Sequence, residues 1–591
     1  MPQSATRHWR EGWTELEALA QKVELSGTQE LPGCTLRHEF LIPLLQKGLR
    51  SNYLLPAQYR RMMNLLRFGA DLFIDKEYLN DHLPSRVYRK NYPSAYENKV
   101  AVTTAIAARV TAGRTMKIGV FSRSEFANLP VSQAIIFPMG AVPKPQAKLG
   151  DTVEYRPFGD HTRSRLNEAA RPGKHSLTAL KELGRLLTRG KFMRMSDIDG
   201  AFTLLPLVPW LWKYKLFMWY DVDLPLEKQT EANVLYCHLF ADFGTVGCPD
   251  EWFEFFNVIL DLARMENVLR SPLVLYVDDL SHIGDSDCAA RLDEEGEELD
   301  AFLVAAGTPT KQKKTKNAAR IQLSLGLWWN SINFTIALDA GKKDVYIEYL
   351  TSMADRKVVN LRDMQRIAGR EQRVALTLMP GSKVLLANNF ILMAGLSLPH
   401  HHRRTTRAWR DDRSAMVRCL NENAGRGYYR YDDFVDGGDV WTDASKPGKG
   451  LAGGGYVVDD GQYHFWNFGS AVSRRPIDYL EGKTVVMCVE DVGHLWSGKI
   501  IRFHIDNQSF QASAVKGWSH ADRLNELLRD MLYLTVKFNV IISYEWISTH
   551  DNVLADPLSR IDEPLFLERA ASSGSPLLGP VSRHPDAGSR R

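Results

Sequence analysis

The segment Leu273–Leu280, with the sequence LVLYVDDL, constrains the fold of this chain more than any other stretch. A strand-like apolar run ends in two adjacent aspartates, Asp278 and Asp279, and a second apolar stretch continues through Ile283. This pattern predicts a strand, a tight turn and a second strand, because short polar side chains favour turns between apolar strands. An ordinary hairpin that carries two aspartates by chance is the alternative. The apolar runs on both sides of the full string favour a functional hairpin.

The length of the chain requires several domains. It has 591 residues, whereas single hydrophobic cores stop growing at about 250–300 residues. Hydrophobic periodicity and composition indicate a multidomain α+β protein. The predicted regions are a helical N-terminal region at 1–115, an α+β region at 116–350, a mostly helical region at 351–435, an α/β domain at 436–564 and a disordered Ser, Gly and Pro-rich tail at 565–591.

Charge, cysteines and hydropathy limit the class of protein. The net charge is +4, from 74 basic and 70 acidic residues, so bulk charge neither requires nor excludes a nucleic-acid partner. The six cysteines are scattered without a CxxC pair, which predicts reduced thiols and no zinc site. No stretch approaches the roughly 18 apolar residues of a membrane span, and no apolar signal core is present. We therefore expect an intracellular protein, in the cytoplasm, the nucleus or both, with no membrane partner.

A third carboxylate lies upstream of the predicted hairpin. Asp197 ends a strand-like run and is followed by Phe202 at +5 and Pro206 at +9. Between the two carboxylate segments, Phe243 and Gly244 precede an apolar helical stretch. In order and spacing these strings resemble motifs A, B and C of reverse transcriptases. The resemblance implies a right-hand polymerase with fingers, palm and thumb, which copies RNA and DNA templates into DNA.

The same resemblance implies a metal-dependent active site. Asp197, Asp278 and Asp279 would hold two Mg²⁺ ions, with Mn²⁺ as an alternative, because hard cations prefer carboxylate oxygens. Without a cation, clustered carboxylates would repel one another and raise one another's pKa. Asp199 is one residue away from the family position and would point to the opposite face of the strand.

Four further residues resemble the nucleotide-binding elements of this family. Lys144 and Arg156 match the lysine and arginine that bind the triphosphate on the fingers hairpin, although solvated surface charges are the simpler explanation for each alone. Phe202 matches the steric gate that excludes ribonucleotides, with a core aromatic as the alternative. Gly244 belongs to the loop that supports template and nucleotide, and deoxynucleoside triphosphates are the implied substrates. The run Lys311–Lys316 resembles motif D, but the resemblance does not choose among its four lysines.

A second carboxylate set follows in the C-terminal part of the chain. Asp443, Glu481, Asp506 and Asp556 come in the order of the ribonuclease H family, and the string around Asp556, NVLADPLSR, is close to its retrotransposon form. By resemblance, all four would hold two metal ions and cleave the RNA strand of an RNA/DNA hybrid.

One position departs from the ribonuclease H pattern. The histidine expected near the final carboxylate is replaced by Trp546, and His550 lies four residues later. Either His550 substitutes for the missing histidine or the product-release group is absent, which would make the nuclease slower. A ribonuclease H domain that serves only as a structural platform is a related alternative.

These resemblances together predict a retrotransposon reverse transcriptase with a fused ribonuclease H, similar to DIRS-like or gypsy-like elements. The expected partners are an RNA or DNA template-primer, an RNA/DNA hybrid and deoxynucleoside triphosphates. The competing hypothesis is a domesticated or decayed copy that binds nucleic acid without catalysis. Such a copy would be expected to have lost some of the seven carboxylates, and all seven are present.

Overall fold

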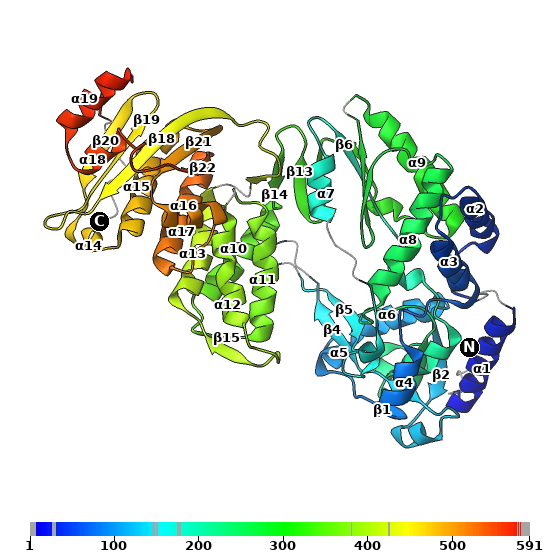
Figure 1. Cartoon of the computed structure of the whole chain (residues 1–591). Helices are drawn as coiled ribbons and strands as arrows, with labels where there is room; N and C mark the ends of the chain where they lie inside the picture. Colours follow the sequence, from blue (N-terminus) through cyan, green and yellow to red (C-terminus); the bar gives the residue numbers. More distant parts are fainter. Residues whose placement is uncertain are drawn as a thin grey trace. The chain divides into compact units, whose positions relative to one another are not determined.

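The chain is a mixed α/β protein of two compact units (Figure 1). The computed structural model describes residues 7–26, 31–144, 148, 150, 152–173, 179–285, 287–379, 381–422, 426–575, 577 and 579–580. The first unit comprises 1–146 and 151–325, and the second comprises 147–150 and 326–591. All six cysteines are free. Within the described residues, we find no helix with the length and apolar character that a membrane crossing requires.

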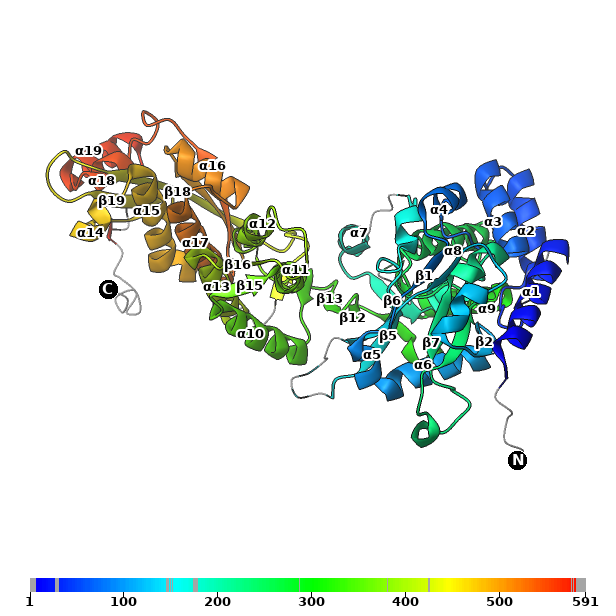
Figure 2. The same cartoon turned by 90° about the horizontal axis from the view of Figure 1, so that it is seen from below.

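The N-terminal helices of the first unit belong to its main hydrophobic core. Trp9 and Trp13 of the first helix are buried in the same cluster as Ile118 and Phe217 of the strands. Figures 1 and 2 both show α2 and α3 beside α8, which they contact. The helices of this unit are α1 (Trp9–Ser26), α2 (His38–Arg50), α3 (Pro56–Phe68), α4 (Lys76–His82), α5 (Pro93–Glu97), α6 (Lys99–Thr111), α7 (Ala179–Leu186), α8 (Cys248–Met265) and α9 (Ala289–Ala306).

Two sheets and a hairpin complete the first unit. A five-stranded sheet has the order β1 (Arg86–Tyr88), β3 (Ala134–Ile136), β7 (Leu216–Trp219), β8 (Val234–His238), β2 (Thr115–Val120). A four-stranded sheet has the order β11 (Lys316–Ala319), β6 (Phe192–Asp197), β10 (Asp279–Gly284), β9 (Leu273–Tyr276). The hairpin pairs β4 (Met139–Pro143) with β5 (Tyr155–Gly159), and β12 (Ile321–Ser324) ends the unit.

Short 3-10 helices join several of these elements. In the first unit they are η1 (Arg123–Asn128), η2 (Leu166–Ala169), η3 (Ala201–Leu204), η4 (Pro209–Tyr214), η5 (Leu226–Lys228) and η6 (Gln312–Lys314), and in the second unit η7 (Ser382–Leu385) and η8 (Gly493–Leu495). Of these, η3 follows β6, which ends at Asp197, and η6 precedes β11.

The second unit begins with a mostly helical part. Its core includes a buried ion pair between Arg413 and Glu371, 2.7 Å apart. The helices are α10 (Ala340–Ala354), α11 (Leu361–Ala375), α12 (Ala387–Met393) and α13 (Arg407–Glu422). The strands are β13 (Leu327–Asn330), β14 (Thr335–Ala337) and β17 (Arg426–Tyr428) in one sheet, with β15 (Val358–Asn360) paired to β16 (His402–Arg404).

A six-stranded sheet forms the C-terminal part of the second unit. Its order is β22 (Ile541–Trp546), β21 (Lys499–Ile505), β18 (Val435–Ser445), β19 (Gly453–Val458), β20 (Gln462–Asn467), β23 (Gly579–Pro580). The accompanying helices are α14 (Ser470–Ser473), α15 (Ile477–Val492), α16 (Gln508–Lys516), α17 (Asp522–Phe538), α18 (Ala555–Ser559) and α19 (Glu563–Ser573). Adjacent side chains of β19 meet different helices, since the Tyr456 hydroxyl lies against Asp491 of α15 and Val457 is in the same core cluster as Leu558 of α18. These two helices therefore cover opposite faces of the sheet.

The expected disordered tail from residue 565 is helical in its first part. α19 extends to Ser573, and Phe566 and Ala570, four residues apart, are buried against Tyr463 and Leu558. The Asp562 side chain accepts a hydrogen bond from the Leu565 amide and caps the helix. These two buried apolar side chains anchor the helix, although the average composition of the tail predicts disorder. Residues 581–591 of the predicted tail lie outside the described residues.

Candidate active sites

The structure confirms the predicted hairpin of two strands and a tight turn around Asp278 and Asp279. β9 and β10 pair in antiparallel register with Tyr276 opposite Asp279, which leaves a two-residue turn. β10 also pairs with β6, and there Asp279 lies directly opposite Asp197. The Ile198 amide donates to the Asp278 carbonyl at 2.8 Å. Strand pairing therefore brings all three predicted carboxylates of this site to one end of the four-stranded sheet.

The turn between β9 and β10 is strained. Val277 has φ of +57°, a conformation that is rare for a β-branched residue and costs about 1–3 kcal/mol. Its carbonyl accepts a hydrogen bond of 2.6 Å from the indole of Trp252. Trp252 is fully buried in α8. This helix thus fixes the turn that carries Asp278.

Two lysines neutralise the carboxylate of Asp197. Lys311 Nζ lies 2.9 Å from Oδ1 and Lys314 Nζ lies 2.8 Å from Oδ2. Of the four lysines between 311 and 316, the structure therefore places Lys311 and Lys314 at the carboxylate. Asp199 lies beyond the end of the strand with its side chain 61% exposed, and Lys311 Nζ is 3.6 Å away.

The pKa of Asp279 is raised to about 6. Burial is the largest cause, followed by the negative charges of Asp278 and Asp197, and the two lysines act in the opposite direction. Three clustered carboxylates repel one another, and here two lysines offset part of that repulsion. Such a cluster of carboxylate oxygens is suited to bind a hard divalent cation. Asp197, Asp278 and Asp279 would be its ligands.

A cavity of about 1230 Å³ opens beside these carboxylates. Its lining includes the predicted site residues Lys144, Arg156, Phe202 and Asp278, together with Lys311. Cationic side chains from the β4–β5 hairpin thus lie at the same cavity as a turn carboxylate from the sheet. Asp197, Asp279 and Gly244 are adjacent in the fold but are not part of this lining.

Phe202 is both a packed aromatic and part of the cavity wall. It is 8% exposed, and its ring meets Phe243 edge to face with centroids 4.8 Å apart. The guanidinium of Arg156 lies over the ring of Phe243, 5.2 Å from its centroid. Phe243 therefore links the predicted steric gate to the predicted triphosphate arginine.

Gly244 occupies a position that only glycine fits. Its φ is +119°, and a Cβ atom there would lie 1.9 Å from the carbonyl oxygen of Gly159. The Gly159 amide donates to the Phe243 carbonyl at 3.0 Å. The Phe243–Gly244 loop consequently rests directly on the end of β5.

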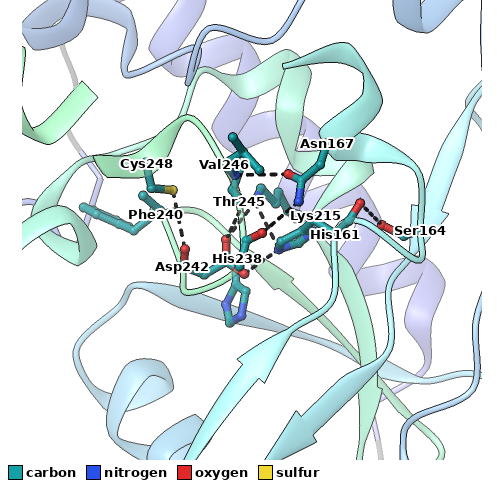
Figure 3. A network of polar contacts seen from close by, with 12 residues as sticks. His161, Ser164, Asn167, Lys215, His238, Phe240, Asp242, Thr245, Val246 and Cys248 are labelled. Atoms are coloured by element: carbon teal, nitrogen blue, oxygen red, sulfur yellow. Dashed lines mark hydrogen bonds and ion pairs between the residues drawn. The ribbon is translucent and has the colours of Figure 1, made fainter. Parts of the chain in front are cut away.

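Charged groups beneath this loop were not identified from the sequence. Lys215, Asp242 and His161 form a buried network there (Figure 3). The available signal was a lysine at 215 within the largely apolar stretch 211–219, since lysine is almost never fully buried unless it is paired.

Three of the four carboxylates of the second predicted set lie close together. β18 and β21 are parallel with Thr442 opposite Ile505, so the next residues, Asp443 and Asp506, follow neighbouring strands at the same edge. Glu481 reaches them from α15. One ligand atom from each of these three residues lies within 4.8 Å of the other two.

The electrostatics of this second site favour a bound cation. Burial, and then the charges of Asp506 and Asp556, raise the pKa of Asp443 to about 7. Burial also raises the pKa of Glu481 well above its usual value. Among the described side chains, Glu481 Oε2 is buried without a hydrogen-bond partner. Because buried polar oxygens are nearly always satisfied, this oxygen fits a metal ligand.

Asp556 lies outside the close group of three. Its Oδ1 pairs with Arg560 at 2.8 Å, four residues later on the chain, and Oδ2 lies 3.7 Å from Arg569 of α19. These cations neutralise the fourth predicted carboxylate.

The last residue of β22 and the segment after it contact Asp506. The Trp546 indole donates to the Asp506 carbonyl at 3.0 Å, and the Thr549 hydroxyl donates to Asp506 Oδ2 at 3.0 Å. Trp546 is 47% exposed, and His550 is exposed. Trp546 thus lies next to the carboxylate group, at the position where the family pattern has histidine.

Comparison with known proteins gives structural neighbours only. No protein-family model and no curated protein matches the sequence. Three solved structures of a foamy viral protease-reverse transcriptase are similar, each at 14% identity. The dRH form in complex with double-stranded DNA has a TM-score of 0.43, with 85% of this chain and 81% of that chain covered. The complex with RNA/DNA hybrid has 0.41 with 85% and 63% covered, and a complex with double-stranded DNA has 0.39 with 86% and 97% covered.

Proposed function

We propose that this chain is an RNA- and DNA-directed DNA polymerase of a retrotransposon that also cleaves the RNA strand of RNA/DNA hybrids. One observation carries the proposal. Asp197 and Asp279 lie opposite each other on the paired strands β6 and β10, and Asp278 is in the adjoining turn. A cavity beside them is lined by cationic side chains and an aromatic ring. In this proposal the β4–β5 hairpin belongs to the fingers, the four-stranded sheet to the palm and α11–α13 to the thumb.

In the polymerase site, the three aspartates would hold two divalent metal ions, Mg²⁺ or Mn²⁺. When bound, such ions activate the primer 3′-hydroxyl and stabilise the pyrophosphate leaving group. Lys144 and Arg156 would bind the triphosphate, to which a guanidinium can donate two hydrogen bonds. The edge of Phe202 that lines the cavity would contact the sugar and exclude a 2′-hydroxyl.

In the ribonuclease site, Asp443, Glu481 and Asp506 would hold the metal ions, which activate water for cleavage when bound. Asp556 would complete this set by moving away from Arg560 and Arg569. The exposed ring of Trp546 would lie against the hybrid beside Asp506. Proton transfer at product release would then fall to His550 or to water.

The two carboxylate clusters, which include the buried side chains of Asp197, Asp443 and Glu481, favour catalysis over the competing hypothesis of a decayed binding protein. Clustered buried acids destabilise a fold unless a cation compensates them, so a copy without catalysis gains nothing from keeping them. The test is incorporation of dTTP by the purified chain on an oligo(dT)-primed poly(rA) template with Mg²⁺. Incorporation supports the proposal, and template binding without incorporation supports the decayed copy.

Replacing Phe202 with valine should relax sugar selection. The smaller side chain removes the ring edge from the cavity wall, so discrimination against UTP relative to dTTP should fall about a hundredfold. Comparison of kcat/KM for the two nucleotides measures the effect. Phe202→Tyr keeps the ring and should retain discrimination, and equal selectivity of the valine variant and the parent chain would exclude a steric gate at this position.

Lowering the pH from about 8 to about 6 should raise the Mg²⁺ requirement of RNA cleavage more than that of DNA synthesis. The pKa of Asp443 is raised to about 7 and that of Glu481 well above its usual value, whereas Asp279 has a pKa of about 6. Mg²⁺ binds deprotonated carboxylates, so below each pKa the requirement rises about tenfold per pH unit and per displaced proton. Half-saturating Mg²⁺ concentrations measured for both activities test this, and parallel shifts would contradict it.

A further inference from the structure

A buried charged network lies beneath the Phe243–Gly244 loop (Figure 3). Lys215 Nζ lies 2.7 Å from Asp242 Oδ1 and also donates to the hydroxyl of Thr245. His161 Nε2 lies 2.7 Å from the other carboxylate oxygen, Oδ2. Lys215 and His161 have no exposed surface, and Asp242 is 4% exposed. A single carboxylate therefore joins two basic side chains inside the core of the first unit.

The hydrogen bonds fix the protonation of this network. An ionised carboxylate only accepts, so both Lys215 Nζ and His161 Nε2 donate to Asp242. His161 Nδ1 is buried with no hydrogen-bond partner among the described atoms, so a second ring proton would be unsatisfied. Burial accordingly lowers the pKa of His161. One positive and one negative charge remain in this network, and Lys215 and Asp242 compensate each other directly.

The network joins three segments that are distant in sequence. Asp242 and Thr245 lie immediately before and after the Phe243–Gly244 loop. His161 follows the end of β5, and Lys215 immediately precedes β7. Lys215 thus holds both ends of the loop, and His161 ties one end to the base of the hairpin that carries the predicted triphosphate arginine.

Asn167 secures the same loop from its outer side. Its amide nitrogen donates to the Gly244 carbonyl at 3.0 Å, and its amide oxygen accepts from the Val246 amide at 3.1 Å (Figure 3). Phe243, held between these attachments, contacts both Phe202 and Arg156. A displacement of the loop would therefore move two walls of the nucleotide cavity at once.

We propose that Lys215, Asp242 and His161 are positioning residues that hold the Phe243–Gly244 loop against the β4–β5 hairpin and thereby set the affinity for the incoming deoxynucleoside triphosphate. The inference rests on the proposed polymerase function. A buried ion pair is a poor source of stability compared with apolar packing. It does select one geometry, because any other loop position leaves a buried charge without its partner. The network therefore affects nucleotide binding, while the metal-binding carboxylates govern the chemical step.

The test uses Asp242→Asn, which keeps the size of the side chain and removes its charge. KM for dTTP and the Kd of a fluorescent dTTP analogue on the template-primer complex should each rise about ten- to hundredfold, while kcat changes less than about threefold. Asn167→Ala removes two loop contacts at a partly exposed position, so it should fold even if Asp242→Asn does not. It should raise the same two constants by a smaller factor.

Glu295→Gln is the matched control. Glu295 is a buried carboxylate of α9 that accepts hydrogen bonds from two backbone amides and lies 3.2 Å from His282 Nε2. None of these hydrogen bonds involves the Phe243–Gly244 loop. We expect this variant to lose stability while KM and Kd stay within about twofold of the parent chain.

The outcomes separate the inference from the proposed function. Nucleotide binding by the parent chain without incorporation overturns the polymerase proposal and leaves the Kd comparison as the test of the network. Unchanged KM and Kd in both Asp242→Asn and Asn167→Ala, or equal effects of Glu295→Gln, overturn the positioning role. Absence of nucleotide binding by the parent chain overturns both.

Discussion

Replacing Asp278 and Asp279 together with asparagine should reduce dTTP incorporation on poly(rA) by about a thousandfold or more, a loss of roughly 4 kcal/mol of transition-state stabilisation. Amides cannot supply the negative charge that holds two divalent cations at the end of β9 and β10. The fold should tolerate the change, since it removes both the burial cost and the charge repulsion that raise the pKa of Asp279 to about 6. Initial rates at saturating dTTP and Mg²⁺ measure the effect.

The control for this double variant lies in the same hairpin. Asp285 is an exposed aspartate just beyond the end of β10, away from the turn. Asp285→Asn should incorporate dTTP at the rate of the parent chain. A double variant that keeps more than about a tenth of the parent rate, with the same Mg²⁺ dependence, would show that the paired aspartates do not hold the catalytic ions.

Replacing Glu481 with glutamine should abolish cleavage of RNA in a hybrid and leave DNA synthesis within about twofold. Burial keeps the pKa of Glu481 well above its usual value, so a neutral side chain of the same shape suits the metal-free fold. The variant should therefore remain folded and lose the thermal stabilisation that Mg²⁺ gives to the second unit by binding the native state. Cleavage of a labelled hybrid and melting curves with and without Mg²⁺ provide the two measurements.

Asp478 provides the control on the same helix. It is a mostly buried carboxylate paired with Arg523 at 2.6 Å, and it is not part of the close group of three. Asp478→Asn should lower the melting temperature and keep Mg²⁺-dependent cleavage. If Glu481→Gln still cleaves the hybrid, the metal ions of the second unit are not bound by this group.

Local patterns in the sequence predict the helices and strands of both sites, but they do not predict the electrostatic environment of the sites equally well. The apolar runs around Asp278 and Asp279 are enough to predict a hairpin, because turn and strand preferences are local. The placement of Asp197 opposite Asp279 depends on the pairing of β6 with β10, for which spacing along the chain gives only indirect evidence. The resemblance to known motifs supplied that link.

Contacts between distant side chains were not predictable in this way. Lys215 is neutralised by Asp242, 27 residues away, and His161, which shares that carboxylate, lies 54 residues before the lysine, so no local window contains the network. The resemblance predicts that Asp556 joins the other three carboxylates, but it lies outside their close group and pairs with Arg560 and Arg569. Arg569 belongs to helix α19, which is not predicted because the average composition of that stretch indicates disorder.

The most direct test of the account follows one reaction with two labels. A DNA primer and an RNA template, each with its own fluorophore, are incubated with the purified chain, all four deoxynucleoside triphosphates and Mg²⁺. We predict extension of the primer and shortening of the template in the same sample, with both lost on chelation of Mg²⁺. Stable binding of the template-primer with neither change, in protein whose melting curve shows a folded chain, would contradict the account.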